Sequence, residues 1–191
     1  MTQRAIDGEY IYFVTTNVQD RRWFFVTPEK ATQLGQTIRT CCRMKKFELL
    51  AYCILPNHIH LLVRKLPADE GLRGAPAAQR TLGSVRCETE DDAFLFSHRR
   101  LPSRRSLEKR PTLSHLMHLI KSAFSQHLHH GKFWQHRSNF RIIETEEYLS
   151  NVVEYIQYNY QKMDLPEHYG EAPFVFVNQA AIDRAFGFSL S

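Results

Sequence analysis

The pattern of apolar and polar positions divides most of the chain into strands and helices of ordinary length. Alternating or continuous runs of bulky and β-branched residues predict four strands, at Glu9–Thr16, Phe47–Ile54, His58–Arg64 and Arg141–Ile143. Apolar residues at helical spacing predict helices at about Pro28–Met44, Thr112–His129 and Thr145–Met163, and a short helix near Asn178–Phe186. Trp23–Val26 is a candidate for a further short extended segment.

The order of these elements is β-α-β-β-α-β followed by a helix. This order predicts an α+β fold of the ferredoxin-like βαββαβ type, with an antiparallel sheet and an added C-terminal helix. Leu55-Pro56-Asn57 is long enough only for a tight turn, so the second and third strands form a hairpin and the third is expected to be central. We expect helices to cover one face of the sheet and to leave the other partly free.

The length of 191 residues predicts a single domain spanning residues 1–191. A segment at about 65–111 has many charges and little periodicity, and we interpret it as a long insertion or mobile loop. An acidic C-terminal extension begins at about residue 166. No leader peptide and no apolar run of about 20 residues is present, and the four cysteines show no C-x-x-C spacing, so we expect a cytoplasmic protein without a membrane partner.

Charge is distributed unevenly along the chain. The formal net charge is +5, yet Arg99–Ile143 holds ten Lys or Arg and one acid, whereas Glu144–Ser191 holds eight Asp or Glu and two basic residues. A basic stretch with interleaved aromatic residues suits a phosphate-bearing partner, especially nucleic acid. The alternative is an ordinary solvated surface.

The segment AYCILPNHIHLLV (Ala51–Val63) places two histidines one residue apart on a predicted strand. Side chains alternate across a strand, so His58 and His60 share a face and Ile59 takes the other. Two imidazoles on a rigid strand form half of a metal site. The alternative is a pair of partly buried sheet histidines.

The last long helix carries a tyrosine and an amide one turn apart on one face. Tyr148, Val152, Tyr155 and Asn159 follow at offsets of four, three and four residues. A phenol can attack a phosphorus atom, and an amide oxygen can bind a hard cation. The alternative is a core tyrosine beside a surface asparagine.

Taken together, these motifs resemble the single-tyrosine HUH (His-hydrophobic-His) transposases, most closely the REP-associated tyrosine transposases of bacteria with their IS200-like domain. The resemblance covers about Tyr10 to Leu165 apart from the insertion. The chain departs from the family in two places: Tyr160 replaces a frequent proline, and the insertion after the third strand is longer than usual. The motifs that carry it are PNHIHLLV (56–63), KSAFSQHLHHGKFWQ (121–135), RIIETEEYL (141–149) and VEYIQYN (153–159).

The resemblance implies an enzyme that cleaves and rejoins single-stranded DNA at hairpins formed by palindromic repeats. It implies Tyr155 as the nucleophile that forms a 5′-phosphotyrosine, and His58, His60 and Asn159 as ligands of Mg²⁺ or Mn²⁺. It favours a monomer, with a homodimer as the alternative, in the bacterial cytoplasm at the nucleoid. The expected DNA-binding residues are Lys121, Lys132, Trp134, Arg137 and Arg141.

Three other functions stay open on the sequence alone. The first is a domesticated protein that binds hairpins without cutting them. The second is another HUH class, a replication initiator or relaxase, although the chain has no room for a helicase. The third is a ferredoxin-like metal-binding or RNA-binding module with structural histidines.

Overall fold

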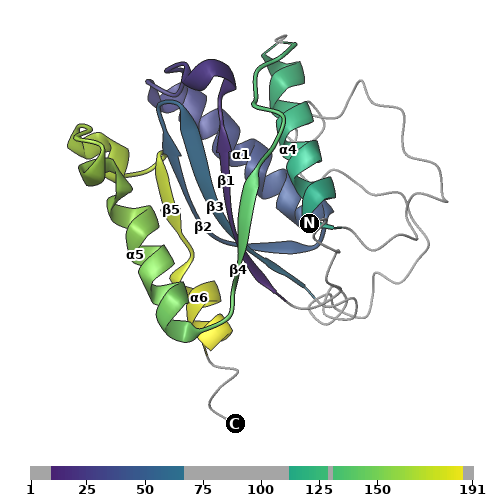
Figure 1. Cartoon of the computed structure of the whole chain (residues 1–191), viewed down its shortest axis with the longest axis vertical. Coiled ribbons are helices and arrows are strands. Elements are labelled where there is room, and N and C mark those ends of the chain that lie inside the picture. Colours follow the sequence, from purple (N-terminus) through teal and green to yellow (C-terminus); the bar gives the residue numbers. More distant parts are fainter. Residues whose placement is uncertain (1–9, 67–111, 129–130, 187–191) are drawn as a thin grey trace, which may run out of the picture.

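A single antiparallel sheet organises the structure, a computed structural model that describes residues 10–66, 112–128 and 131–186. The strand order is β4-β1-β3-β2-β5, so β3 lies in the middle (Figure 1). The strands are β1 (Ile11–Asn17), β2 (Phe47–Leu55), β3 (His58–Lys65), β4 (Asn139–Ile143) and β5 (Val175–Val177).

Four helices accompany the sheet in the described part of the chain: α1 (Pro28–Met44), α4 (Leu113–His127), α5 (Glu146–Lys162) and α6 (Gln179–Phe186). Capping threonines precede two of them, Thr112 before α4 and Thr145 before α5. The Thr145 hydroxyl accepts a hydrogen bond from the Tyr148 backbone N–H, which fixes the start of α5. Short 3₁₀ turns, η1 (Gln19–Arg21) and η4 (Glu167–Gly170), occur in two of the connections.

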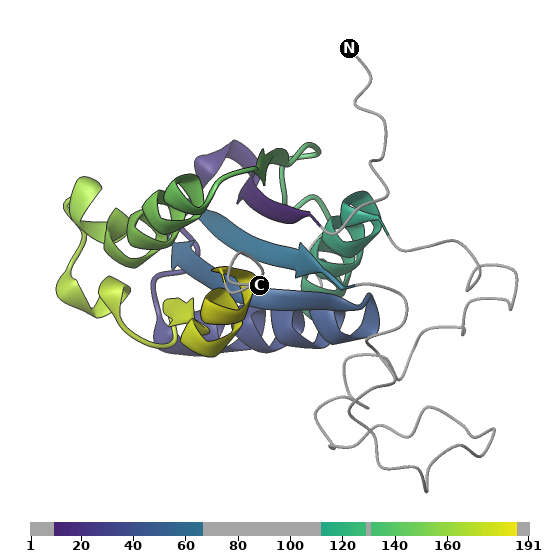
Figure 2. The same ribbon diagram turned by 90° about the horizontal axis from the view of Figure 1, so that it is seen from below.

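Helices pack on both faces of the sheet. α1 and α4 cover one face with a core that includes Leu34, Ile59 and Phe124. α5 and α6 cover part of the other face with a second core that includes Leu62 and Ile156. Figures 1 and 2 show α5 and α6 separated from α1 and α4 by the sheet.

The predicted α+β, ferredoxin-like fold with its added helix is confirmed. The helix at Pro28–Met44 has the predicted bounds, and the other predicted strands and helices differ by one or two residues at their ends. Two predictions are wrong. A fifth strand, β5, pairs with β2, and helices cover both faces rather than one because α5 and α6 bury apolar side chains on the second face.

Three smaller expectations have separate outcomes. Trp23–Val26 is irregular backbone, not a strand. The expected insertion at about 65–111 lies outside the described residues, except for its first two positions. Within the described ranges, no helix is both long and apolar enough to cross a bilayer. Cys42 and Cys53 are buried free thiols, and Cys41 is buried as well.

Candidate active site

β3 places His58 and His60 on the sheet face that α5 packs against. The register sets His60 opposite Thr15 of β1 and opposite Cys53 of β2. The two imidazole rings lie 4.9 Å apart, centre to centre, at right angles to one another. The predicted common face for the two histidines is therefore confirmed, while Ile59 lies in the opposite core.

Each ring nitrogen of His60 lies near a side-chain hydroxyl. Its Nδ1 lies 2.9 Å from the Thr15 hydroxyl, and its Nε2 lies 3.5 Å from the Tyr155 hydroxyl. The Phe13 ring stacks on it with a centre separation of 5.3 Å. Burial, and secondarily the neighbouring His58, lower the pKa of His60 to about 3, so this imidazole is neutral at neutral pH.

His58 has a defined tautomer because its neighbour on Nδ1 only accepts hydrogen bonds. Asn57 Oδ1 lies 2.6 Å from His58 Nδ1, so Nδ1 donates and Nε2 keeps its lone pair. Burial, and secondarily the charge of Arg21, lower the pKa of His58 to about 4. Both histidines thus present neutral rings, the state that binds a metal ion.

α5 brings Tyr155 onto this pair of histidines. The Tyr155 ring lies edge-on to His60, with centres 5.2 Å apart, and edge-on to Phe13 at 6.0 Å. Burial raises the pKa of the Tyr155 phenol, and the neighbouring Asn159 amide opposes this rise. The Lys162 ammonium, about two turns further along α5, lies 4.8 Å from the centre of the Tyr155 ring.

Asn159 is buried beside the phenol and lacks a partner for its amide nitrogen. Only 3% of the residue is exposed, and its Nδ2 forms no hydrogen bond. The oxygen and nitrogen of an amide exchange places when the group rotates by half a turn. In that orientation the carbonyl oxygen occupies the place of the unpaired nitrogen, where it is available to a cation.

The residues present fit a divalent cation. Two neutral imidazoles and an amide oxygen form the kind of mixed nitrogen and oxygen donor set that Mn²⁺ accepts, and Mg²⁺ with less preference. Within the described residues, no group of three or more His, Cys, Asp or Glu side chains is placed to hold a metal ion. Among the described residues, the candidate donors are His58, His60 and Asn159.

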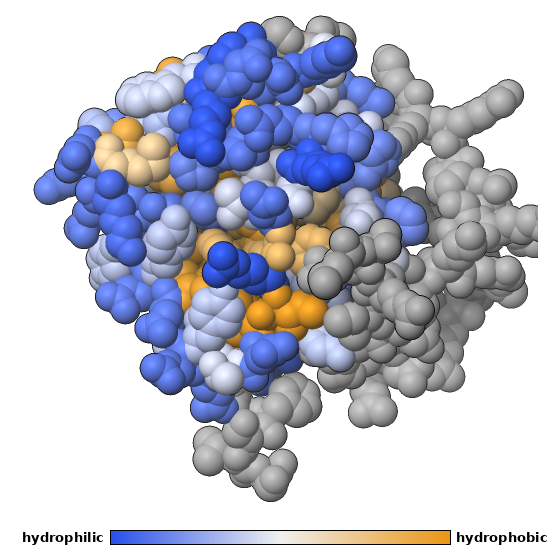
Figure 3. All heavy atoms as spheres, in the orientation of Figure 1, coloured by the Kyte–Doolittle hydropathy of each residue, from blue (hydrophilic) through white to orange (hydrophobic). Residues whose placement is uncertain are grey.

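The site opens into a hollow of about 680 Å³ between α5 and the β1–β4 side of the sheet. In Figure 3, apolar side chains are visible over the lower part of β4 and toward α5, with hydrophilic side chains around them. Arg141, one of the expected DNA-binding residues, is exposed on β4 and lines this hollow. The hollow is lined by Phe13, Thr15, His60, Asn139, Phe140, Arg141, Tyr148, Asn151, Val152 and Tyr155.

Three of the other expected DNA-binding residues line a second hollow, of about 970 Å³, beside α4. These are Lys121, Lys132 and Trp134. The Lys121 ammonium donates to the backbone carbonyls of Gln135 (2.8 Å) and His136 (3.4 Å), and burial lowers its pKa to about 8.

Trp134 and Arg137 differ in their availability to a ligand. Trp134 is 8% exposed, and its ring packs against Phe25, Phe124 and Phe133. The Trp134 ring is therefore largely part of the core, and its expected role in DNA binding stays a prediction. Arg137 is exposed and lies outside both hollows.

Sequence reasoning missed the residues that surround the histidines and the tyrosine. Phe13 and Thr15 come from β1, Cys53 from β2 and Lys162 from the last turn of α5. Their role depends on strand register and helix rotation, which no local pattern in the sequence reveals. Alternation along β1 gives the only available signal, because it places Phe13 and Thr15 on one face.

Comparison with known proteins supports the resemblance found in the sequence. Residues 9–70 match the family model described as transposase IS200 like. A protein of Haemophilus influenzae described as a REP-associated tyrosine transposase is 37% identical over 60 residues, which are 31% of this chain and 33% of that protein. The matched part thus spans about a third of the length of that relative.

A solved structure of a REP-associated tyrosine transposase bound to a REP hairpin has the same fold. The TM-score is 0.59 with 20% sequence identity, over 92% of this chain and 80% of that chain. The predicted resemblance to the single-tyrosine transposases is confirmed.

Proposed function

From this resemblance, we propose that the chain is a metal-dependent DNA strand transferase that cleaves and rejoins single-stranded DNA at hairpin sites. Tyr155 is the nucleophile, and His58, His60 and Asn159 hold Mg²⁺ or Mn²⁺. The observation that carries the proposal is the meeting of the two halves of the site. The Tyr155 hydroxyl lies 3.5 Å from His60 Nε2, although the residues are 95 positions apart in the sequence.

The chemistry assigned to Tyr155 is a transesterification. Its oxygen forms a bond to the scissile phosphorus while the bond from phosphorus to the 3′ oxygen breaks. The phenol proton is released, and the 3′ oxygen leaves as a hydroxyl. The 5′-phosphotyrosine keeps the energy of the phosphodiester, so attack by a 3′-hydroxyl of another strand rejoins DNA.

The surroundings of Tyr155 act on its proton in opposite directions. Burial holds the proton on the phenol, whereas the neighbouring Asn159 amide favours its loss. A divalent cation bound to the histidines and the amide supplies Lewis acidity to the scissile phosphate. The protein orients that phosphate beside Tyr155 through Arg141, the exposed cation of the same hollow.

A DNA hairpin is the proposed partner, because the structurally similar transposase was solved with a REP hairpin bound. Lys121, Lys132 and Arg137 supply positive charge for its phosphates beside α4 and in the following segment. Since the histidines and the tyrosine meet within one chain, a monomer suffices for cleavage.

Covalent trapping tests the proposal. The protein is incubated with Mn²⁺ and a labelled DNA hairpin that carries a single-stranded extension, and the products are separated on a denaturing gel. We expect a labelled protein–DNA adduct in the wild type and none in Tyr155→Phe. Tyr158→Phe, three residues along α5 and 49% exposed, is the matched control and keeps the adduct.

The outcomes separate the competing functions. Retention of the hairpin on a native gel, without any adduct over a panel of repeat-derived hairpins, assigns the chain to non-cleaving hairpin binding instead. An adduct that survives in Tyr155→Phe contradicts the role of this tyrosine.

A further inference from the structure

The segment before α1 combines strain, positive charge and an exposed aromatic ring at one end of the site. Its residues are Asp20, Arg21, Arg22 and Trp23, all of them exposed. Trp23 is 65% exposed, the largest value among the large hydrophobic side chains of the described residues. Tryptophan this exposed is unusual in a monomer, because burying the ring contributes strongly to stability.

Hydrogen bonds fix this segment against the turn that precedes His58. The Val18 N–H donates to the Asn57 carbonyl (2.9 Å) on one side of the segment. On the other side, the N–H groups of Phe24 and Phe25 both donate to the Pro56 carbonyl (2.7 and 3.0 Å). Trp23 thus directly precedes Phe24, which is hydrogen-bonded to the turn before His58.

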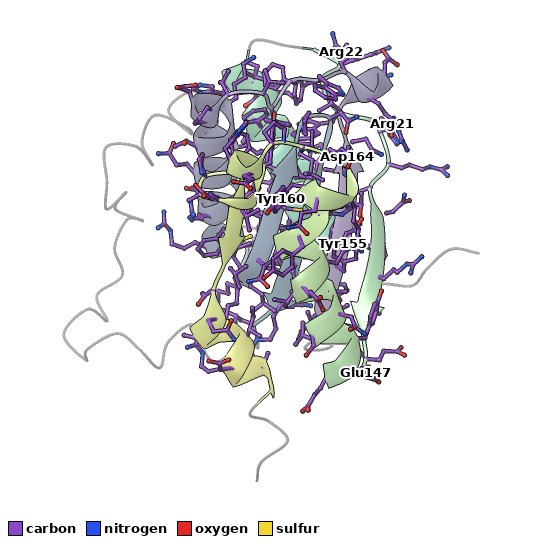
Figure 4. The ribbon with its side chains drawn as sticks, turned by 90° about the vertical axis from the view of Figure 1, so that its left-hand side faces the viewer. Arg21, Arg22, Glu147, Tyr155, Tyr160 and Asp164 are labelled. Atoms are coloured by element: carbon purple, nitrogen blue, oxygen red, sulfur yellow. The ribbon has the colours of Figure 1, made fainter. Side chains whose placement is uncertain are left out.

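The backbone of the segment is strained at two consecutive residues. Asp20 and Arg21 have φ values of 57° and 50°, in the left-handed region that non-glycine residues seldom occupy. Such a conformation costs free energy and is found more often at active sites and ligand-binding sites than elsewhere. Figure 4 shows Arg21 and Arg22 at the end of the molecule toward which α5 runs from Glu147 past Tyr155.

We propose that Trp23, with Arg21 and Arg22, binds the single-stranded DNA that flanks the cleavage site, with one base stacked on the Trp23 ring. An indole face stacks on any base, and two guanidinium groups beside it neutralise adjacent phosphates. Because the segment is tied to Pro56 and Asn57, the strand that it binds continues directly into the site of His58. This inference rests on the proposed function and deepens it by assigning the site for the single strand.

The test compares two DNA ligands in a background that cannot cleave. Affinities of Tyr155→Phe protein are measured without metal for a blunt hairpin and for the same hairpin with a ten-nucleotide single-stranded extension. The ratio of the two affinities isolates the contribution of the single strand. We expect Trp23→Ala to lower this ratio by about 5- to 150-fold, the effect of one lost base stack, and to leave blunt-hairpin affinity unchanged.

Fluorescence gives a second readout, because the sequence holds two tryptophans and Trp134 is buried. Binding of the extended hairpin should quench emission in the wild type and not in Trp23→Phe. Arg21→Ala should reduce the salt dependence of the extended ligand by about 0.7 per lost phosphate contact. Tyr158→Ala removes another exposed aromatic ring and should change neither ligand's affinity.

Three results would overturn the inference. The first is that Trp23→Ala leaves the affinities for both ligands unchanged, and the second is that it lowers both affinities by the same factor. The third is an unchanged ratio of affinities together with an altered sedimentation coefficient of the free Trp23→Ala protein. The last result would assign Trp23 to self-association. Absence of an adduct in the wild type would contradict cleavage instead, and the two failures are distinct because this binding assay needs neither metal nor Tyr155.

Discussion

Replacing Thr15 with valine removes one hydrogen bond and keeps the shape of the side chain. The Thr15 hydroxyl lies 2.9 Å from His60 Nδ1, on the opposite side of the ring from Tyr155. If this hydroxyl accepts a hydrogen bond from Nδ1–H, the lone pair of His60 resides on Nε2 and faces the proposed metal site. Valine cannot accept that hydrogen bond, so the tautomer of His60 is no longer fixed.

The expected magnitudes differ for stability and for metal binding. Loss of one hydrogen bond lowers the free energy of unfolding by about 0.5–1.5 kcal/mol. Loss of a partner that orients a metal-binding histidine weakens metal affinity by about 10–100-fold, which is about 1.4–2.7 kcal/mol. We therefore expect the Mn²⁺ concentration for half-maximal adduct formation to rise by that factor in Thr15→Val.

Two assays measure these effects separately. Adduct formation is titrated with Mn²⁺, and ¹⁵N NMR of the metal-free protein reports which nitrogen of His60 carries the proton. Thr16→Val is the matched control, because its buried hydroxyl has no hydrogen-bond partner and its removal should not reduce stability. An Mn²⁺ midpoint within about twofold of wild type, together with an unchanged His60 tautomer, would refute the assignment to Thr15.

Three further perturbations test the site and its surroundings. The pKa of His60 lies at about 3, below its ordinary value of about 6.5, so the free energy of unfolding falls as the pH drops from 6.5 toward 3. In chemical denaturation, His60→Gln should reduce this pH slope by up to about 1.4 kcal/mol per pH unit, whereas the control His118→Gln, at an exposed position, should not. Asn159→Leu removes an unpaired buried amide, so thermal unfolding without metal should show equal or higher stability, whereas calorimetry should show loss of Mn²⁺ binding. The pKa of Lys121 is lowered to about 8, so the affinity for a DNA hairpin at low salt should fall as the pH rises through 8. Lys121→Met should abolish this pH dependence, and Lys132→Met should keep it.

Local patterns in the sequence predicted the elements that carry the catalytic side chains. Alternation along β3 was sufficient to place His58 and His60 on one face. Capping by Thr145 and helical spacing along α5 were sufficient to place Tyr155 and Asn159 together. Each of these inferences needs only residues that are close in the sequence.

Features that depend on contacts between distant segments could not be predicted in the same way. The pairing of Thr15 with His60 follows from strand register, which the sequence alone does not give. β5 is only three residues long, too short to show alternation, and forms because β2 offers an edge. The aromatic ring of Trp134 has the same local sequence signal whether it stacks on DNA or packs against Phe25.

Mapping of the covalent attachment site tests the central claim most directly. The adduct formed with Mn²⁺ and an extended hairpin is digested with protease and nuclease, and mass spectrometry locates the residual phosphonucleotide. The account predicts that it is attached to Tyr155, the phenol that lies 3.5 Å from His60 Nε2. Attachment to Tyr148 or Tyr158, or recovery of bound hairpin without any modified peptide, would contradict it.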